Sequence, residues 1–207
     1  IISVEEGKIH VRTSAACIGQ GMATVTTQIA CETLNLPPEM IVAEAPDTRR
    51  TPNSGTTTAS RQSLFTGEAT RRAAMQLRYE LDMGRALSDL EGEEFYGEYS
   101  AKTDPLINDK KSPVSHAGYG YAAEVAILDD KGKVAKFVAA YDMGQVVNPR
   151  AAEGQIEGGI AMGMGYALTE KFALEEGYVK AKYATLGLVN ATQVPPIETI
   201  LVHADNL

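Results

Sequence analysis

The chain has 207 residues, which suffices for one large domain or two small ones with a buried core. Its 44% hydrophobic and 22% charged residues are typical of a soluble globular protein, and a formal net charge of −8 argues against partners such as nucleic acid or anionic membranes. The two cysteines, Cys17 and Cys31, form no disulfide framework, and no apolar run has the roughly 20 residues of a membrane span. These features favour a reducing, cytoplasmic compartment.

The first part of the chain has the pattern of a hairpin, a glycine turn, a helix and a strand. Alternating apolar residues predict a β-hairpin over residues 1–14, with its turn at Glu6–Lys8. The glycine turn Gly19-Gln20-Gly21 follows and opens a helix predicted over residues 22–34, which ends before a Leu-Pro-Pro sequence because proline cannot continue it. Residues 41–43 are expected to form a strand.

A polar loop and a long helix come next. Residues 49–60 are rich in hydroxyl side chains and turn formers, so they are expected to form a loop. A helix is predicted from Arg61 to Met83, with Ser60 as its N-cap and Thr58 as the alternative. Residues 84–117 are acidic and irregular, and one short strand is expected among them. The apolar stripe of the long helix is expected at Leu64, Ala74, Leu77 and Leu81.

The second half of the chain repeats this order of elements. A hairpin is predicted over residues 119–138, and Asn148-Pro149 is a typical helix start. The helix expected over residues 149–170 carries several glycines, each of which costs roughly 1 kcal/mol in a helix. Close approach by a ligand, another helix or a sheet must therefore explain them.

Two Gln-centred glycine segments, Gly19-Gln20-Gly21 and Gly154-Gln155, are interpreted as glycine turns that open helices. Such a turn lets a ligand approach the backbone, and the helix N-terminus offers unpaired N–H groups to anionic oxygens. The amide side chain adds donors and an acceptor without charge. Together they suggest that a phosphate-bearing cofactor is clamped from two sides. Gly154 is expected near a ligand, whereas Gly163 and Gly165 are expected to pack against another element.

The predicted fold class is α+β, with two sandwich-like units of mixed sheets and helices. The order of hairpin, Gln-containing turn and helix occurs twice, which suggests a weak internal duplication. The first cofactor-binding unit is expected over residues 1–117, including its connecting loop, and the second over residues 118–207. Because the chain begins with Ile1 rather than Met and stops directly after a strand-like run, it looks like a segment of a longer polypeptide.

Three long strings carry a family resemblance. They are Gly19–Leu34, GQGMATVTTQIACETL; Asp47–Gln62, DTRRTPNSGTTTASRQ; and Asp142–Glu170, which begins DMGQVVNPRAAEGQIEGG. In this order they resemble the molybdenum-cofactor-binding part of the molybdenum hydroxylases of the xanthine dehydrogenase and aldehyde oxidase family. The chain is similar to a fragment of the molybdopterin-binding (large or C-terminal) subunit, and most of all to that of a bacterial xanthine dehydrogenase.

The resemblance implies which residues hold the cofactor. Gln20, flanked by Gly19 and Gly21, is expected to hydrogen-bond it near the metal. Gln155 is expected to contact the pterin from the second unit. A further turn is expected to hold the pterin and its phosphates through N–H groups and hydroxyls. This turn consists of Thr58, Ala59, Ser60, Arg61 and Gln62.

The resemblance also implies the cofactors. The group is molybdenum–molybdopterin, commonly as the cytosine dinucleotide in bacterial members, while iron–sulfur clusters and FAD lie on other domains or subunits. The metal's ligands come mainly from the pterin. No protein metal site is predicted, because His10, His116 and His203 have no Cys or carboxylate at ligand spacing.

The implied activity is water-derived hydroxylation of a purine-like small molecule such as xanthine or hypoxanthine. Residues Lys182–Ala184 and Pro195–Glu198 resemble purine-oxidising members, and oxidation of an aldehyde or another N-heterocycle is the alternative. The family's general-base glutamate lies in a Gly-x-Gly-Glu loop that is expected beyond the C-terminus. No catalytic residue is therefore assigned here, and the isolated chain is expected to be inactive.

From spacing alone, other interpretations stay open. Gln20 is also typical of an ordinary turn residue, and Arg61 of a surface residue. Cys17 lies close to the glycine turn and is expected to be a small buried apolar residue rather than a neighbour of the cofactor. A nucleotide- or phosphate-binding module without redox chemistry is an alternative function, although the chain has no GxxxxGK[ST] sequence and no clean GxGxxG. A structural fragment that binds nothing is the third.

Overall fold

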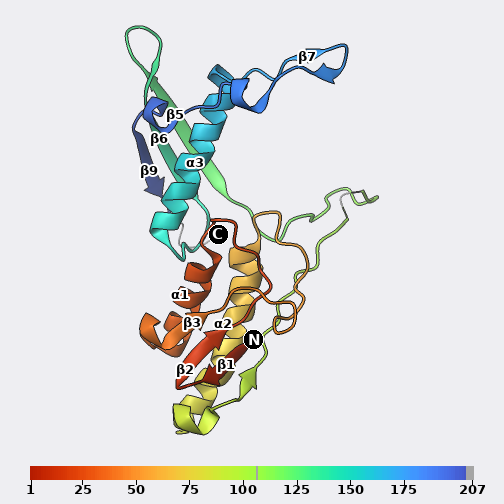
Figure 1. The fold of residues 1–207 in the computed structure, drawn as a ribbon, viewed down its shortest axis with the longest axis vertical. Coiled ribbons are helices and arrows are strands. Elements are labelled where there is room, and N and C mark those ends of the chain that lie inside the picture. Colours follow the sequence, from red (N-terminus) through yellow and green to blue (C-terminus); the bar gives the residue numbers. More distant parts are fainter. Residues whose placement is uncertain (106, 204–207) are drawn as a thin grey trace. The chain divides into compact units, whose positions relative to one another are not determined.

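In the computed structural model, which describes residues 1–105 and 107–203, the chain divides into two units, Ile1–Ala117 and Gly118–Leu207 (Figure 1). Both units combine a sheet of parallel and antiparallel strands with helices, which confirms the α+β fold class. The cofactor-binding role of each unit stays a prediction. Within the described residues, none of the helices combines the length and hydropathy needed to cross a membrane.

Unit 1 is built on a four-stranded sheet with the order β3-β2-β1-β4. The predicted hairpin is formed by β1 and β2, which are antiparallel, and β3 lies parallel to β2. The short strand expected in the acidic region is β4, which pairs with β1. The elements are β1 (Ile2–Glu5), β2 (Lys8–Val11), α1 (Met22–Leu34), β3 (Ile41–Ala43), α2 (Gln62–Asp82) and β4 (Glu94–Phe95), with 3-10 turns at Pro38–Met40 and Leu87–Leu90.

Side-chain alternation in the hairpin places the core of unit 1 between the sheet and its two helices. Apolar side chains of β1 and β2 point to one face and are at most 2% exposed: Ile2, Val4, Ile9 and Val11. They form one cluster with Leu34 of α1 and with Ala74 and Leu77 of α2. The opposite face of the hairpin carries polar side chains, because successive residues of a strand point to opposite faces.

Helix α1 has the predicted bounds, and its end has a local cause. Asn35 adopts the left-handed conformation at φ 54°, and the N–H of Leu36 donates to the Cys31 carbonyl at 3.1 Å. A left-handed residue directly after a helix lets the following N–H groups satisfy the last carbonyls. The Pro-Pro sequence lies beyond this stop.

Helix α2 begins within one residue of the prediction, but its predicted cap is wrong. Arg61 occupies the N-cap position, and no side chain caps the helix. Ala59 and Ser60 have positive φ values of 57° and 50°, whereas a capping serine needs an extended backbone. The turn before α2 is therefore left-handed, and the Ser60 hydroxyl does not close the helix.

The apolar stripe of α2 is confirmed except at its first member. Buried positions of the helix include Thr66, Thr70, Ala74 and Leu77, which follow helical spacing. Leu64 is 41% exposed because it precedes Thr66 by two residues, which places it on nearly the opposite side of the helix.

Unit 2 has a three-stranded sheet with the order β5-β6-β9 and a separate two-stranded ribbon, β7-β8. The predicted hairpin and helix start are confirmed: Asn148 Oδ1 accepts a hydrogen bond of 2.8 Å from the Ala151 N–H, and Pro149 is the first helical residue. Ala139, Ile156 and Ile160 form the buried core. The elements are β5 (Tyr121–Leu128), β6 (Val134–Asp142), α3 (Pro149–Leu168), β7 (Leu174–Glu175), β8 (Tyr178–Val179) and β9 (Ile197–Leu201), with 3-10 turns at Tyr183–Thr185 and Ala191–Gln193.

The two units repeat one topology. Each has an antiparallel hairpin, then a helix, then a strand parallel to the second hairpin strand: β1-β2-α1-β3 in unit 1 and β5-β6-α3-β9 in unit 2. A parallel neighbour requires a crossover connection, and in both units that connection contains the helix that follows the hairpin. The duplication suggested by the order of elements is therefore present in the topology.

Candidate functional site

The Gly19-Gln20-Gly21 turn leaves the first N–H groups of α1 without a side-chain cap. Gly19 and Gly21 have φ values of 112° and 78°, a backbone region that suits glycine. Gly21 is the N-cap residue of α1, and no side-chain hydrogen bond caps the helix. The acceptor for N–H groups at the start of α1 is the exposed Cys17 sulfur rather than a capping oxygen at Gly21.

The Gln20 side chain closes its own turn. Its Nε2 donates to the Ala16 carbonyl at 2.7 Å, and its Oε1 accepts from the Ile18 N–H at 2.6 Å. A primary amide has two N–H donors, so one donor of Gln20 is left over. The turn-forming role of Gln20 is therefore observed, and its contact with a cofactor stays a prediction.

Cys17 marks the point where these backbone donors converge. Its side chain is exposed, so the expectation of a buried apolar cysteine is wrong. Hydrogen bonds from the backbone at Gly19, Met22 and Gly21 hold the pKa of the Cys17 thiol below its ordinary value. The N–H groups of this turn therefore favour a negative charge at the start of α1.

The loops that precede α1 and α2 meet in unit 1. The Ala16 N–H donates to Thr57 Oγ1 at 2.9 Å, and the Ser54 N–H donates to Ser14 Oγ at 2.9 Å. These bonds join the loop before α1 to the loop before α2. The sequence separates them by about 40 residues, and the fold places them side by side.

The turn from Thr58 to Gln62 has an unusual backbone. Ala59 and Ser60 are consecutive non-glycine residues with positive φ, a conformation that occurs often at ligand-binding sites. At the end of the turn, Gln62 accepts a hydrogen bond from the Thr66 hydroxyl, one helical turn on. The turn is thus followed by a fixed helix start, while its own contacts with a ligand stay a prediction.

Arg61 lies at the end of this turn. Its Nη2 donates to the Thr56 carbonyl at 2.9 Å, and its Cζ lies 5.3 Å from the centre of the Phe65 ring. Among the described residues of unit 1 it forms no ion pair, unlike the other arginines of the unit. A guanidinium without a carboxylate partner suits an anionic ligand.

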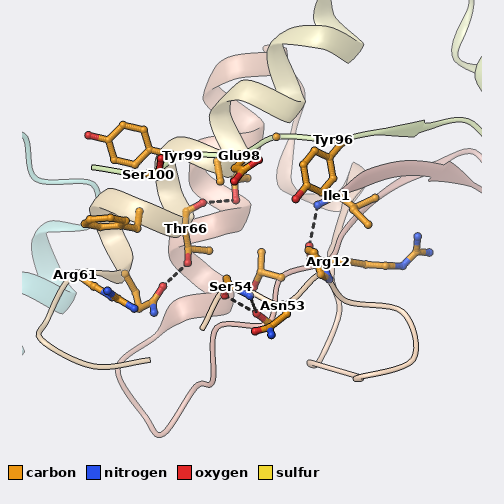
Figure 2. Close-up of a pocket in the computed structure, with 18 of the residues that line it drawn as sticks. Ile1, Arg12, Asn53, Ser54, Arg61, Thr66, Tyr96, Glu98, Tyr99 and Ser100 are labelled. Carbon is orange, nitrogen blue, oxygen red and sulfur yellow. Dashed lines mark hydrogen bonds between the residues drawn. The ribbon is translucent and has the colours of Figure 1, made fainter. Parts of the chain in front are cut away.

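A pocket of 410 Å³ opens beside Arg61. Figure 2 shows Arg61 and Thr66 at the start of α2, Asn53 and Ser54 from the loop before it, and Tyr99 from the segment after β4. Ligand pockets typically enclose about 300–1,000 Å³ and combine apolar walls with a few polar groups. This pocket has that character, with hydroxyl, amide, aromatic and guanidinium groups in its wall. Its other lining side chains include Ser14, Gln62, Phe65, Thr70, Tyr96, Glu98 and Ser100.

Sequence reasoning did not find the part of this pocket that follows β4. Tyr99 and Glu98 lie in the acidic, irregular stretch of residues 84–117, and no local pattern marks them as site residues. Gly97 brings the segment close to α2, since a Cβ at this position would lie 2.0 Å from the Ala69 carbonyl oxygen.

Unit 2 carries the second glycine segment inside a helix. Gly154 and Gln155 lie in the second turn of α3, so the prediction of a glycine turn there is wrong: Asn148 caps the helix, which begins earlier. Gln155 is exposed, and outside α3 no atom of the described residues lies within 4 Å of a Cβ built at Gly154 or Gly158. This face of α3 is open, as a ligand-facing glycine requires; the Gln155 contact itself stays a prediction.

The later glycines of α3 differ from each other. At Gly165 a Cβ would lie 3.3 Å from Val189 Cγ2, which agrees with the expected packing role. At Gly163 it would meet nothing within 4 Å among the described residues outside the helix, so the packing role expected there is wrong.

The polar face of the hairpin holds a cluster that resembles a metal site. Ligand atoms of Glu5, His10 and Glu44 lie within 4.8 Å of one another, although the sequence shows no carboxylate at ligand spacing from His10. Arg12 donates to Glu5 and Glu44, and Arg50 lies 3.3 Å from Glu44. The carboxylates are thus already paired with two guanidinium groups, which disfavours a metal ion.

Comparison with known proteins identifies the family. A family model described as a molybdopterin cofactor-binding domain matches residues 2–94 and 86–195. The putative xanthine dehydrogenase molybdenum-binding subunit of Escherichia coli is 29% identical over 83% of this chain and 27% of that subunit. The aldehyde oxidoreductase of Megalodesulfovibrio gigas is 31% identical over 81% of this chain and 20% of that protein.

Solved structures agree with the sequence matches. The aldehyde oxidoreductase of Desulfovibrio desulfuricans superposes with a TM-score of 0.78 and 27% identity, over 98% of this chain and 24% of that one. This chain therefore spans about a quarter of the length of the relatives it matches. The family match, the shared fold and the loops that meet in unit 1 agree with one another. The chain therefore belongs to the family of molybdopterin cofactor-binding domains found in molybdenum hydroxylases.

Proposed function

We propose that this chain holds the molybdenum–molybdopterin cofactor of a hydroxylase through the Gly19–Gly21 turn and the Thr58–Gln62 turn, with Gln155 as a further contact from unit 2. The observation that carries the proposal is the pair of hydrogen bonds that joins the loops at Ala16–Thr57 and Ser14–Ser54. These bonds bring the loop that contains the first turn to the loop that leads into the second.

The donor set of unit 1 fits an anionic, phosphate-bearing group. Backbone groups of the glycine turn converge on the exposed Cys17 sulfur, and Arg61 has no carboxylate partner among the described residues. Both features favour negatively charged oxygens. Arg61 and the turn before it would hold phosphate, and the remaining donor of Gln20 would reach a neutral polar atom of the pterin.

Bound cofactor would supply oxidative hydroxylation of an electron-poor carbon, with oxygen derived from water. The role proposed for this chain's residues is to bind and orient the cofactor. We propose a purine such as xanthine as the substrate, supported by the similarity to a xanthine dehydrogenase subunit; the comparably similar aldehyde oxidoreductase supports an aldehyde or another N-heterocycle as the alternative.

The finer features of the whole enzyme also belong to this proposal. We propose the cytosine dinucleotide form of the cofactor, electron transfer to iron–sulfur and FAD domains or subunits, and a cytoplasmic location. The match to the gamma subunit of a 6-hydroxypseudooxynicotine dehydrogenase complex, 29% identical over 95% of this chain, supports a multi-subunit enzyme.

Elemental and pterin analysis of the protein from its native host tests the proposal. We expect stoichiometric molybdenum and a pterin that releases CMP on hydrolysis. Gln20→Ala should lower the pterin content while the thermal unfolding midpoint changes little, because Gln20 is in an exposed turn. A folded protein without molybdenum and without pterin would contradict the proposal and favour a phosphate-binding module without redox chemistry.

A further inference from the structure

Arg61 is electrostatically distinct among the arginines of unit 1. In the described residues, each of the others forms an ion pair with Asp or Glu, whereas the Arg61 guanidinium contacts a carbonyl and an aromatic ring. Glu98 lines the same pocket, yet no ion pair joins it to Arg61. The paired arginines are Arg12, Arg49, Arg50, Arg71, Arg72, Arg78 and Arg85.

Arg61 is the first of a row of four side chains. The guanidinium lies over the Phe65 ring, with 5.3 Å from Cζ to the ring centre. Phe65 meets Tyr99 edge to face, with ring centres 5.4 Å apart and an interplanar angle of 64°. Arg72 lies over the other ring of the pair, with its Cζ 5.0 Å from the centre of Tyr99. The order along the row is therefore cation, aromatic ring, aromatic ring and cation, and each neighbouring pair attracts.

The segment that carries Tyr99 is anchored to α2. Arg72 Nη1 donates to the Glu98 carbonyl at 2.9 Å, and Gln76 Nε2 donates to the Tyr96 carbonyl at 2.7 Å. Gly97, between these two carbonyls, has no room for a Cβ against the Ala69 carbonyl oxygen. The backbone before Tyr99 is thus fixed on the helix, and its ring has a defined place against Phe65.

We propose that Phe65 and Tyr99 are positioning residues that hold the Arg61 guanidinium at the pocket edge for a phosphate group. This inference rests on the proposed function, because it assigns a phosphate to Arg61. The rings restrict the Arg61 side chain, which has four rotatable bonds, and they leave its charge in place. An ion pair with Glu98 would instead neutralise that charge. Less conformational entropy is then lost when the phosphate binds.

Calorimetric binding of inorganic pyrophosphate to the purified, cofactor-free protein at low ionic strength tests the proposal. Arg61→Ala should weaken binding about tenfold or more, the range for a hydrogen bond between charged groups. Phe65→Leu, which keeps an apolar side chain but removes the ring, should weaken it roughly two- to fivefold, the range for an exposed cation–π contact. Tyr99→Leu removes the ring that packs edge to face on Phe65 and should weaken binding by a similar factor. Tyr99→Phe, which keeps the ring, should restore binding. The matched control is Tyr79→Leu, an exposed tyrosine of the same helix outside the row, which should bind as the unchanged protein does.

A double-mutant cycle separates positioning from other effects. In the Arg61→Ala protein, Phe65→Leu should cause no further loss of pyrophosphate binding. Full binding by Phe65→Leu, or equal losses with and without Arg61, would overturn the positioning role while leaving the Arg61 contact in place. Unchanged binding by Arg61→Ala would instead contradict the phosphate contact assumed in the proposed function. Far-ultraviolet circular dichroism checks the fold of each variant, and Phe65→Leu carries the test if Tyr99→Leu unfolds.

Discussion

Arg12 is a buried cation held by carboxylates from three different segments. Its side chain is 2% exposed, and it donates to Glu5, to Glu44 at 3.0 Å and to Glu94 at 3.2 Å. Burial of a charge is unfavourable unless partners and hydrogen bonds compensate it. The network therefore ties the hairpin to the loop after β3 and to β4, at the cost of making unit 1 sensitive to acid.

Glu5 supplies a pH prediction. The hydrogen bond from Arg12 lowers the pKa of Glu5 from 4.5 to about 2. A carboxyl whose pKa is lower in the folded state stabilises the fold above its unfolded pKa, and this stabilisation is lost as the pH falls through the folded value. We expect the free energy of unfolding to fall between pH 4.5 and about 2, and to fall less steeply in Glu5→Gln.

Urea unfolding at several pH values measures this effect. Glu32→Gln is the control, since it removes an exposed carboxylate that forms no ion pair among the described residues. An identical acid dependence in Glu5→Gln and in the unchanged protein would exclude Glu5 from the acid transition.

The two cysteines should differ in reactivity. Hydrogen bonds from the glycine turn lower the pKa of Cys17, whereas burial raises the pKa of Cys31. Because the thiolate is the nucleophile, iodoacetamide should alkylate Cys17 first, with a pH midpoint below that of an ordinary thiol at about 8.5. Peptide mass spectrometry of protein alkylated from pH 6 to 9 measures both sites. In 8 M urea the two rates should converge; equal rates in the native protein would mean that the turn does not direct its N–H groups at the sulfur.

At the scale of elements, helix α2 organises unit 1. One side of the helix packs Ala74 and Leu77 into the core, while Phe65 and Arg72 contact Tyr99 of the segment after β4. The segment reaches α2 because Gly97 permits direct contact between the two backbones. The pocket wall therefore depends on one glycine outside any helix or strand.

Gly97→Ala tests this dependence. The new Cβ would lie 2.0 Å from the Ala69 carbonyl oxygen, so the segment must move away from the helix. We expect the free energy of unfolding to fall by about 1–3 kcal/mol, the range for overpacking. Gly118→Ala is the control, since its Cβ would meet no described atom within 4 Å. Denaturant unfolding compares the two, and equal stabilities would contradict the close contact.

Local patterns predict the regular elements of this chain well. Helix α1 has the expected bounds, and the starts of α2 and α3 fall within one residue of the expected positions. Spacing and capping are short-range properties, and these helices follow them. The errors lie where the backbone departs from those rules: Ser60 is left-handed rather than a cap, and Gly154 belongs to a helix rather than a turn.

At the scale of the whole chain, one topology occurs in both units: an antiparallel hairpin, a helix, and a third strand parallel to the second. In each unit this arrangement carries one of the Gln-containing segments. Gln20 lies in the turn before α1, whereas Gln155 lies within α3. The duplication thus extends to the topology but not to the local geometry around the two glutamines.

By itself the sequence determined the α+β class, the order of the elements and the loops that resemble a molybdopterin site. Periodicity, turn chemistry and motif order are properties of residues close together in the sequence, so they can be recognised without the fold. Tertiary structure decided which distant residues meet. Arg12 reaches Glu44 and Glu94 across 32 and 82 positions, and the Tyr99 ring reaches Phe65 from a separate segment. Such contacts follow from how the strands pair and how the segment after β4 packs on α2, and no short window of the sequence contains that information.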